Sequence, residues 1–456
     1  MKYIKLKKVM MNILVLMIPM CSNMGNVQAQ TQTLVVTLKE CIEYGLENNR
    51  STTVFTNQVA IAKQKSVEAL SAYLPQANGT VTLDDNIKLQ TTLIPAGELS
   101  PTPLRVTLGN PFASNMVVRV DQTIYDNTLI TGLKANKPNI EVAQLQKEQN
   151  DVNLISDIAK TYYQIVTLQE QEKLLIQNEK RYTEILNTLQ MQYDKGVIKK
   201  NDYDRMKVNL NNTIAQKTYT QTNILLVTNR LKYAMGLDMA ISITLADSIS
   251  GMSEHPVLPV EKREINNRID YKIQLQNLTL QEIDLKRKHA SAYPVLTSYA
   301  QYGVLGYGTT IDKMMNPNQQ FNYAAIGLKL NVPLFSGWKR TSQIRQSAIL
   351  LANAKENLKL NESNYALEIQ NYSTQLLKSY TTLQTNKNNL DLARDVFSTT
   401  SFQYQNGTAN LSDLLNSDYS YKEAQTNYLT SLFDYLATRI DLEKSIGTLK
   451  QYANQL

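Results

Sequence analysis

The sequence predicts a mainly helical protein in which four amphipathic strands interrupt very long helices, arranged as two copies of one unit. Glycine and proline are scarce, with 16 Gly and 12 Pro in 456 residues, and this scarcity favours long uninterrupted helices. Four segments alternate apolar and polar residues, as strands with one apolar face do. Motifs of the first half recur about 210 to 220 residues later, which indicates a two-fold repeat of one large unit.

The duplication rests on short motifs that recur in the same order. The matched pairs are Asn48-Asn49-Arg50 with Asn266-Asn267-Arg268, Ser71-Ala72-Tyr73 with Ser291-Ala292-Tyr293, Ile124-Tyr125 with Leu334-Phe335, and Gln192-Tyr193-x-x-Gly196 with Gln403-Tyr404-x-x-Gly407. Both copies end at a glycine, Gly236 and Gly447. The expected organisation is a first repeat at 30–236, a connector at 237–264, a second repeat at 265–447 and a C-terminal tail at 448–456.

Residues 1–29 have the pattern of a secretory signal peptide. Four lysines, with no acidic residue, accompany an apolar stretch that ends at Met20, and Val27-Gln28-Ala29 offers small residues for cleavage. Cys21 allows a competing interpretation as a lipid-attachment site, although lipoprotein processing prefers a residue smaller than Met20 before the cysteine. Without lipidation, Cys41 is the one cysteine left after cleavage, so no intramolecular disulfide can form.

Each repeat is expected to open with a helix. In the first repeat, Thr37 and Glu40 have the spacing of a capping box, and Val36 and Cys41 occupy the positions of a hydrophobic staple. Cys41 is therefore expected to be a structural apolar residue. Strands are expected to follow over 81–89 and 116–125 in the first repeat, and over 294–308 and 322–335 in the second, around a turn at Asn316-Pro317-Asn318.

Very long helices are expected over 131–195 and 338–405, each about 90–100 Å long at the rise of an α-helix. Pro138 implies a kink or a late start in the first of them. After a glycine-containing turn, a shorter helix is expected to run to Gly236 or Gly447. Apolar residues recur every seven positions in both kinds of helix, which is typical of coiled-coil seams.

Strands in which apolar and polar residues alternate, in an exported protein, favour a membrane barrel with apolar residues outward and polar residues inward. Four strands cannot close a barrel, because about eight is the usual minimum, and an open edge would leave unpaired amides in hydrocarbon. If these strands lie in lipid, several chains must share one barrel. The alternative is a periplasmic coiled-coil structural or adaptor protein that has two small hairpins and no membrane barrel.

The chain resembles the TolC family of outer-membrane efflux proteins over essentially its whole length after the signal peptide. The resemblance is carried by the turns Tyr193-x-x-Gly196 and Tyr404-x-x-Gly407, the helix starts Asp202-Tyr203 and Asp413-Leu414-Leu415, the segment Val332-Pro333-Leu334-Phe335-Ser336-Gly337, and the opening at 38–41. It implies a homotrimer in outer-membrane lipid, with a twelve-stranded barrel that continues as a periplasmic tunnel of helices. It also implies export of small molecules, metal ions or proteins, with a periplasmic adaptor and an inner-membrane transporter as partners.

The resemblance further implies a site at the periplasmic end of the helices. The turn residues that would receive adaptor hairpins are Gly196, Val197, Ile198, Gly407, Thr408 and Ala409. The residues that match the acidic constriction of the family entrance are Asp413, Asn416 and Asp202. Asn416 is uncharged and Ala409 replaces a basic residue, so any latch must differ here. Asp413 also suits the first turn of a helix, where the helix dipole favours an acid.

Neither an enzyme nor a metal, cofactor or nucleic-acid site is predicted. His255 and His289 lack companions at metal-ligand spacing. Gly303, Gly306 and Gly308 do not follow the strand-to-helix pattern of a nucleotide site and are better explained as small residues in a barrel strand. The net charge of +7 includes four lysines of the signal segment, which leaves 43 basic against 40 acidic residues and no clustered excess that phosphate would require.

Overall fold

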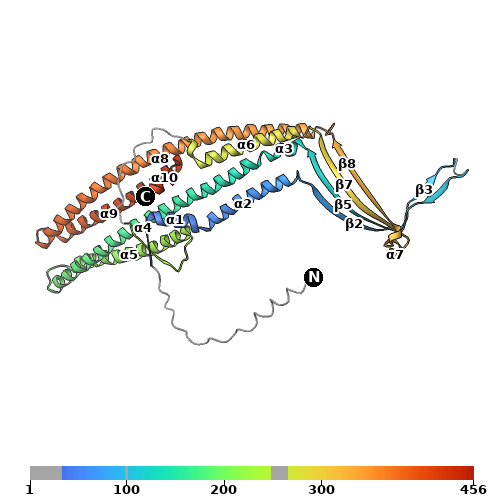
Figure 1. The fold of residues 1–456 in the computed structure, drawn as a ribbon. Coiled ribbons are helices and arrows are strands. Elements are labelled where there is room, and N and C mark those ends of the chain that lie inside the picture. Colours follow the sequence, from blue (N-terminus) through green and yellow to red (C-terminus); the bar gives the residue numbers. More distant parts are fainter. Residues whose placement is uncertain (1–32, 98–100, 248–264, 456) are drawn as a thin grey trace, which may run out of the picture.

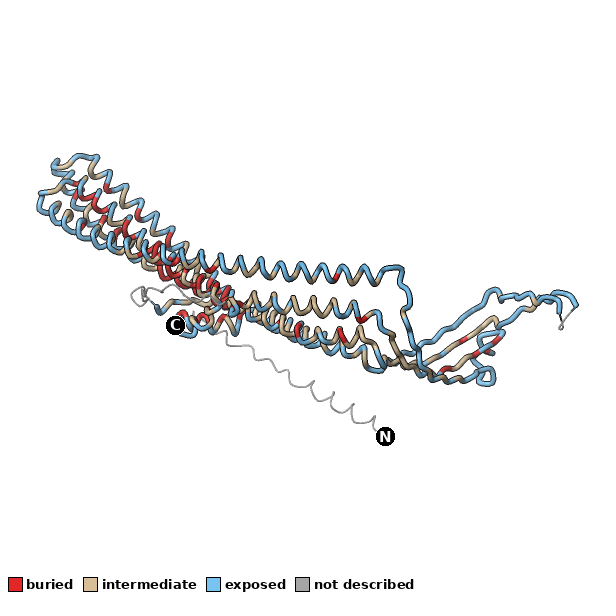
Figure 2. Tube along the Cα trace, turned by 90° about the horizontal axis from the view of Figure 1, so that it is seen from above, coloured by how far each residue is buried: buried red, intermediate tan, exposed pale blue. Residues whose placement is uncertain are grey.

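The computed structural model describes residues 33–97, 101–247 and 265–455. Helices run side by side along the axis of an elongated molecule, and a sheet stands at one end of them (Figure 1). Buried residues concentrate in the part of the helical region that lies away from the sheet (Figure 2). The predicted signal peptide, with the alternative lipid-attachment residue Cys21, lies outside the described residues, as does much of the predicted connector.

The first repeat runs from a short strand to the end of a helical hairpin. β1 (Thr33–Val36) leads into α1 (Leu38–Asn48) and α2 (Arg50–Ser71). The remaining elements are β2 (Gln76–Asp85), β3 (Thr91–Ile94), β4 (Leu104–Thr107), β5 (Phe112–Tyr125), α3 (Asn127–Leu133), α4 (Asn136–Asp194) and α5 (Lys200–Met235). A short break separates α3 from α4 just before Pro138, in agreement with the kink or late start that this proline predicted.

The second repeat follows the same order. Its elements are η2 (Ile265–Asn267), α6 (Ile269–Ala290), β7 (Val295–Gly308), α7 (Ile311–Met314), η3 (Pro317–Gln319), β8 (Gln320–Asn331), α8 (Lys339–Gln405) and α9 (Leu411–Ile446). Within the predicted connector, β6 (Ser242–Leu245) pairs in parallel with β1. The predicted C-terminal tail holds a helix, α10 (Leu449–Gln455), whose Leu449 is buried.

The four long strands form one antiparallel sheet in the order β2-β5-β7-β8. Because side chains alternate along each strand, the register separates an apolar face from a polar face. The apolar face exposes large side chains, which are Val81, Leu83, Met116, Val118, Ile326, Leu328 and Leu330. On the polar face, Arg119 pairs with Asp121 at 2.9 Å and donates to Gln301 at 3.2 Å.

The glycines of β7 leave room for larger side chains that pack against this strand. A Cβ on Gly303 would lie 2.5 Å from the ring of Tyr323, its partner across the strands. Gly306 and Gly308 accommodate Met314 of α7, which is buried at the far end of the sheet.

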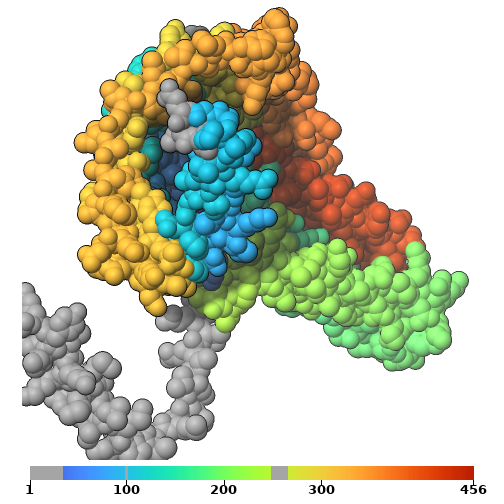
Figure 3. Space-filling model, turned by 90° about the vertical axis from the view of Figure 1, so that its right-hand side faces the viewer, coloured from blue at the N-terminus to red at the C-terminus, as the bar shows by residue number. Residues whose placement is uncertain are grey.

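The helices next to the sheet lie in the same order as the strands to which they connect. α2, α4, α6 and α8 contact one another in that order beside the sheet. Further away, the hairpins α4–α5 and α8–α9 meet along α4 and α9. Viewed from the sheet end, β7 and β8 curve around a hollow in front of which the β3–β4 hairpin stands (Figure 3).

Two of the expected strand ends were wrong, and β2 and β5 also begin earlier than expected, at Gln76 and Phe112. β2 ends at Asp85 instead of continuing to Leu89, because its partner strand β5 begins only after Pro111, and Ile87 is 97% exposed. The following loop contains the unexpected hairpin β3–β4. β8 ends at Asn331 rather than at Phe335, since Pro333 has no N–H to donate to a strand ladder.

The first helix of the first repeat is also divided, at Asn49. The Asn49 side chain accepts from Ser51 N at 2.8 Å and donates to the carbonyl of Ala234 at 2.7 Å. Next to this carbonyl, Gly236 ends α5 in the left-handed region, with φ 73°. The recurring Asn-Asn-Arg motif therefore packs against the glycine that ends a hairpin.

The same contact between an Asn-Asn-Arg motif and the glycine that ends a hairpin, which we call a joint, recurs in the second repeat. Gly447, with φ 80°, ends α9 against Asn267, and a Cβ on Gly447 would lie 2.8 Å from the Asn267 carbonyl. Arg268 donates to the carbonyl of Ser445 at 2.9 Å.

The main core forms around these joints, where α1, α4, α5, α9 and α10 meet. The capping box of Thr37 and Glu40 is present, which confirms the predicted start of α1. Cys41 is fully buried among apolar side chains, as expected for a structural residue, and burial raises the pKa of its thiol to about 12.

Substituting Gly236 by alanine is expected to destabilise the protein by about 2–4 kcal/mol, because the new Cβ would lie 2.7 Å from the Asn48 carbonyl and the positive φ disfavours alanine. Gly196→Ala is the matched control, since Gly196 has the same φ of 73° with open space around it. It should cost only about 1–2 kcal/mol. Thermal unfolding of both variants tests this, and equal losses would contradict the role of the joint.

Candidate functional site

The tips of the two hairpins lie next to each other at the end of the molecule opposite the sheet (Figure 1). Each turn contains a glycine in the left-handed region, Gly196 with φ 73° and Gly407 with φ 74°. The glycine amides donate back to Tyr193 at 2.8 Å and Tyr404 at 3.1 Å, which closes the ends of α4 and α8. Both glycines are therefore turn residues, which confirms the glycine-containing turns expected between the helices.

The six predicted tip residues differ in exposure. Gly196, Val197, Gly407 and Thr408 are exposed, whereas Ala409 is half-buried. Ile198 is also half-buried, because it packs against a group of buried side chains that joins the two hairpins. We call this group the tip cluster, and its buried members are Tyr182, Leu189, Met206, Phe397, Leu411, Leu414 and Leu415.

The two hairpins start their second helices differently. Asn410 caps α9 and forms a capping box with Asp413, in which Asn410 Oδ1 accepts from Asp413 N at 2.9 Å and Asn410 N donates to Asp413 Oδ2 at 3.3 Å. Lys199, at the equivalent position of α5, makes no side-chain cap. Asp413 is thus an exposed first-turn acid with a defined orientation.

The three residues that match the entrance constriction differ in exposure. Asp413 and Asn416 are both exposed, about one turn apart on α9. Asp202 is half-buried near Tyr404 of the other hairpin, where burial first and the negative charge of Asp202 second raise the pKa of the Tyr404 hydroxyl. A further link between the hairpins is the bond from Arg205 Nη1 to Ser412 Oγ at 3.2 Å.

The sequence analysis missed a buried ionic network just inside the tips. Asp418 of α9 is only 3% exposed, and its Oδ1 lies 2.6 Å from Arg181 Nη2 of α4. Its Oδ2 accepts a hydrogen bond from Tyr182 of α4 and lies 3.7 Å from Lys422 Nζ of α9. The guanidinium of Arg181 also stands 4.5 Å from the ring centroid of Phe397 of α8. The network therefore links both hairpins at one carboxylate.

Burial is the largest cause of the pKa shifts of Tyr182 and Lys422 in this network. It raises the pKa of the Tyr182 hydroxyl, and the charge of Asp418 acts in the same direction. It lowers the pKa of Lys422, against the opposing effect of Asp418. One signal could have revealed the network: Asp418 lies on the same helix face as Leu411, Leu414 and Leu415, and an acid on an apolar face needs a partner.

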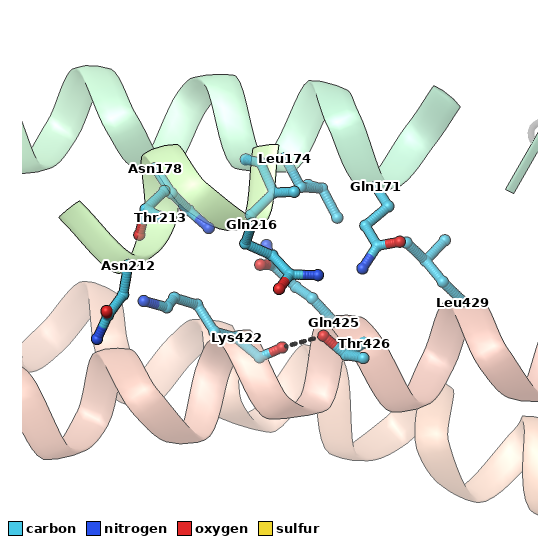
Figure 4. Close-up of a pocket in the computed structure, with 11 residues that line it drawn as sticks. Gln171, Leu174, Asn178, Asn212, Thr213, Gln216, Lys422, Gln425, Thr426 and Leu429 are labelled. Carbon is cyan, nitrogen blue, oxygen red and sulfur yellow. Dashed lines mark hydrogen bonds between the residues drawn. The ribbon is translucent and has the colours of Figure 1, made fainter. Parts of the chain in front are cut away.

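A cavity of about 410 Å³ lies beside the network, between α4, α5 and α9 (Figure 4). Side chains from the three helices converge on it, and most of its polar ones carry amides. They include Gln171, Asn178, Asn212, Gln216, Lys422 and Gln425. The hairpins thus meet through apolar contact at the tip cluster and through polar side chains further from the tip.

Comparison with known protein families identifies the family to which these hairpins belong. The profile described as outer membrane efflux protein matches residues 46–237 and 271–448. The chain belongs to the outer membrane efflux protein family. It is 19% identical over 410 residues to the outer membrane protein TolC of Vibrio cholerae serotype O1, with 86% of this chain and 87% of that protein covered.

Solved structures with the same fold include those of CusC and of VceC from Vibrio cholerae. The CusC structure matches with a TM-score of 0.73 at 14% identity and covers 91% of this chain and 93% of its own. The VceC structure matches with a TM-score of 0.69 at 16% identity, covering 90% and 96%.

The family settles the two predicted alternatives. The chain is an efflux channel of the outer membrane, and the periplasmic coiled-coil protein without a membrane barrel is set aside. The family consists of efflux ducts rather than enzymes. Among the described residues, no helix combines the length and the apolar character needed to cross a membrane.

Replacing Asp418 by asparagine is expected to destabilise the contact between the hairpins by about 2–4 kcal/mol, because it leaves Arg181 without its counter-charge in a largely buried place. Hydrogen exchange of the α4 and α9 amides, together with thermal unfolding, measures the loss. Glu356→Gln is the control, since Glu356 pairs with Lys359 while both side chains are about 70% exposed, and it should change stability by less than about 0.5 kcal/mol. Similar effects of the two substitutions would refute a structural role for the network.

Proposed function

We propose that three copies of this chain close into one channel, which serves as the passive exit duct of a tripartite efflux or type I secretion system. The observation that carries the proposal is the incomplete sheet. Its apolar face is exposed, and within the described residues its edge strands β2 and β8 each pair on one side only. In lipid, unpaired amides at these edges would cost several kcal/mol each, so each edge needs a strand of another copy.

The edge helices support the same closure. α2 and α8 are the outer members of the helix row, and both expose apolar side chains. These are Val54, Ile61, Val67 and Leu70 on α2, and Ile349, Leu350, Leu360 and Leu367 on α8. α8 of one copy packed against α2 of the next would cover such residues, while β8 pairs with β2. This head-to-tail contact closes into a ring, and the resemblance to the TolC family favours three copies and twelve strands.

The segments of the chain take distinct parts in this proposal. Residues 1–29 are removed on export, and 30–236 and 265–447 act as two structural repeats that share the connector 237–264. Within the proposed tail 448–456, α10 packs at the joints through Leu449. The two separate family matches, at 46–237 and 271–448, support this division.

The tips are the proposed contact for the hairpins of a periplasmic adaptor, with an inner-membrane transporter as the source of energy. Their place supports this, because they stand at the end furthest from the membrane sheet and expose Gly196, Val197, Gly407 and Thr408. The cargo is a small molecule, a metal ion or a protein. Asp413 and Asn416 are the proposed entrance constriction, while Asp202 supports it from the contact between the hairpins.

The trimer is tested by native mass spectrometry of the detergent-extracted protein, which is expected to show three chains. Circular dichroism should show that the strands are intact in the same sample. A stable monomer that keeps its sheet would overturn the shared barrel, because four strands would then persist with two free edges.

Adaptor docking is tested by Gly196→Glu and Gly407→Glu. A charged side chain on these exposed turns should abolish export while the trimer still assembles, because the adaptor would contact these residues. Gly196→Asn and Gly407→Asn are the controls, since asparagine tolerates the left-handed region and adds no charge. They should retain most of the export, measured as drug or dye efflux. Normal export by both glutamate variants would remove the tips from the docking role.

The entrance is tested by planar-bilayer conductance of the wild type and of Asp413→Asn. Three Asp413 carboxylates around the axis should favour cations over anions and allow block by multivalent cations. Asn416 adds no charge, so the effect should depend on this one ring. Asp413→Asn should lose both properties, and an unchanged selectivity would leave Asp413 as a helix-capping residue alone.

A further inference from the structure

The corner between β8 and α8 has an unusual backbone. Gly337 and Trp338 both adopt positive φ, at 56° and 65°, and Trp338 is the one non-glycine residue with positive φ among the described residues. Bulky side chains rarely adopt this conformation, because their Cβ crowds the following carbonyl. Such strain persists where the surrounding structure or a function requires it, which makes this corner a candidate site.

The strained corner presents large apolar side chains outward. Leu334, Phe335 and Trp338 are 89%, 80% and 71% exposed, and we call these three residues the corner patch. The rings of Phe335 and Trp338 pack edge to face, with centroids 6.5 Å apart. The patch is thus an ordered apolar surface that other described parts of the chain leave uncovered.

Basic residues follow the corner patch directly. Lys339 is exposed, and Arg340 is held at the corner by a bond from its Nη2 to the Pro333 carbonyl at 3.3 Å. The sequence contains no acidic residue between Asp312 and Glu356. An apolar patch bordered by such positive charge matches the boundary between the acyl chains and the phosphates of a lipid leaflet.

The position of the patch agrees with this boundary. The apolar residues Ile326, Leu328 and Leu330 of β8 lead straight to the corner, beyond which the long helix begins. Two other junctions of strand and helix also expose an aromatic residue, Tyr125 and Tyr293. Aromatic residues at the ends of membrane strands form girdles at the lipid–water interface.

We infer that the corner is a binding site for an anionic phospholipid of the periplasmic leaflet of the outer membrane. Leu334, Phe335 and Trp338 lie among the upper acyl chains, and Lys339 and Arg340 bind the phosphate. The left-handed backbone turns the ring of Trp338 outward at the point where the chain leaves the membrane. This site depends on the outer-membrane location and requires that the corner patch stays outside the contact with the next copy in the proposed trimer; it is independent of the proposed adaptor and cargo.

The chain offers a direct probe, because Trp338 is its single tryptophan. The full-length protein is reconstituted in vesicles that contain a minority of either brominated phosphatidylglycerol or brominated phosphatidylcholine, with bromines near the glycerol end. Bromine should quench the fluorescence of Trp338, whereas aqueous iodide should not. The apparent association with the anionic lipid should be at least about fivefold stronger, as expected for basic residues at an anionic surface.

The double variant Lys339→Gln/Arg340→Gln should lose the anionic preference while bromine still quenches the tryptophan. Lys355→Gln is the matched control, since Lys355 is exposed on the same helix about 24 Å further along and should keep the preference. Equal quenching by the two lipids, or a preference that survives the double variant, would overturn the site. So would a tryptophan shielded from both bromine and iodide, which would place the corner against a neighbouring copy. A tryptophan quenched by iodide alone would place it in water and refute the proposal as well.

Discussion

The exposed apolar face of a four-stranded sheet is the constraint on which the rest of this structure depends. Such a face is stable in lipid, but the backbone groups at its two edges are not, because hydrocarbon offers them no partners. The helices lie in the same order as the strands to which they connect. Among the described residues, the outer helices α2 and α8 therefore lack a neighbour on one side of the row, as the outer strands β2 and β8 do in the sheet. In the proposed ring, one rotation brings a neighbouring copy to both the sheet and the helix row and so completes them together.

The duplication explains why two tips stand at the same level. α5 and α9 have the same length of 36 residues, and each ends at a left-handed glycine that packs against an Asn-Asn-Arg motif. Equal helices that start from equivalent joints bring both turns to one end of the molecule. The tips have diverged in detail, since Asn410 and Asp413 close a capping box on one hairpin while Lys199 leaves the other uncapped. Of the two first-turn acids, Asp413 forms a capping box, whereas Asp202 follows Lys199, which makes no side-chain cap.

The sequence predicted the features that depend on local chemistry. The capping box at Thr37, the turn glycines Gly196 and Gly407, and the long helices were found from spacing alone, because each has a local physical cause. The pairing of β1 with β6 was missed because it joins residues about 200 positions apart with no alternating pattern. The break at Asn49 has its cause in Ala234, and the network at Asp418 in Arg181, so neither is encoded within one window of sequence. The constriction and the docking role rest on the resemblance to a family and stay proposals.

The contact between the hairpins combines two kinds of interaction with different energetic consequences. The tip cluster and the main core bury apolar side chains, and apolar burial contributes most of the net free energy of packing. Between them lie the Asp418 network and the cavity beside it, where the cost of desolvation offsets much of the attraction between charges and amides. The Asp418 network and the cavity therefore add little net stability, but any arrangement in which Asp418 loses its partners has a higher free energy. It fixes how α9 is placed along α4, and the tip cluster supplies the free energy that keeps the two turns together. A mutation in the cluster should thus separate the tips, whereas a mutation in the network should let them shift relative to each other.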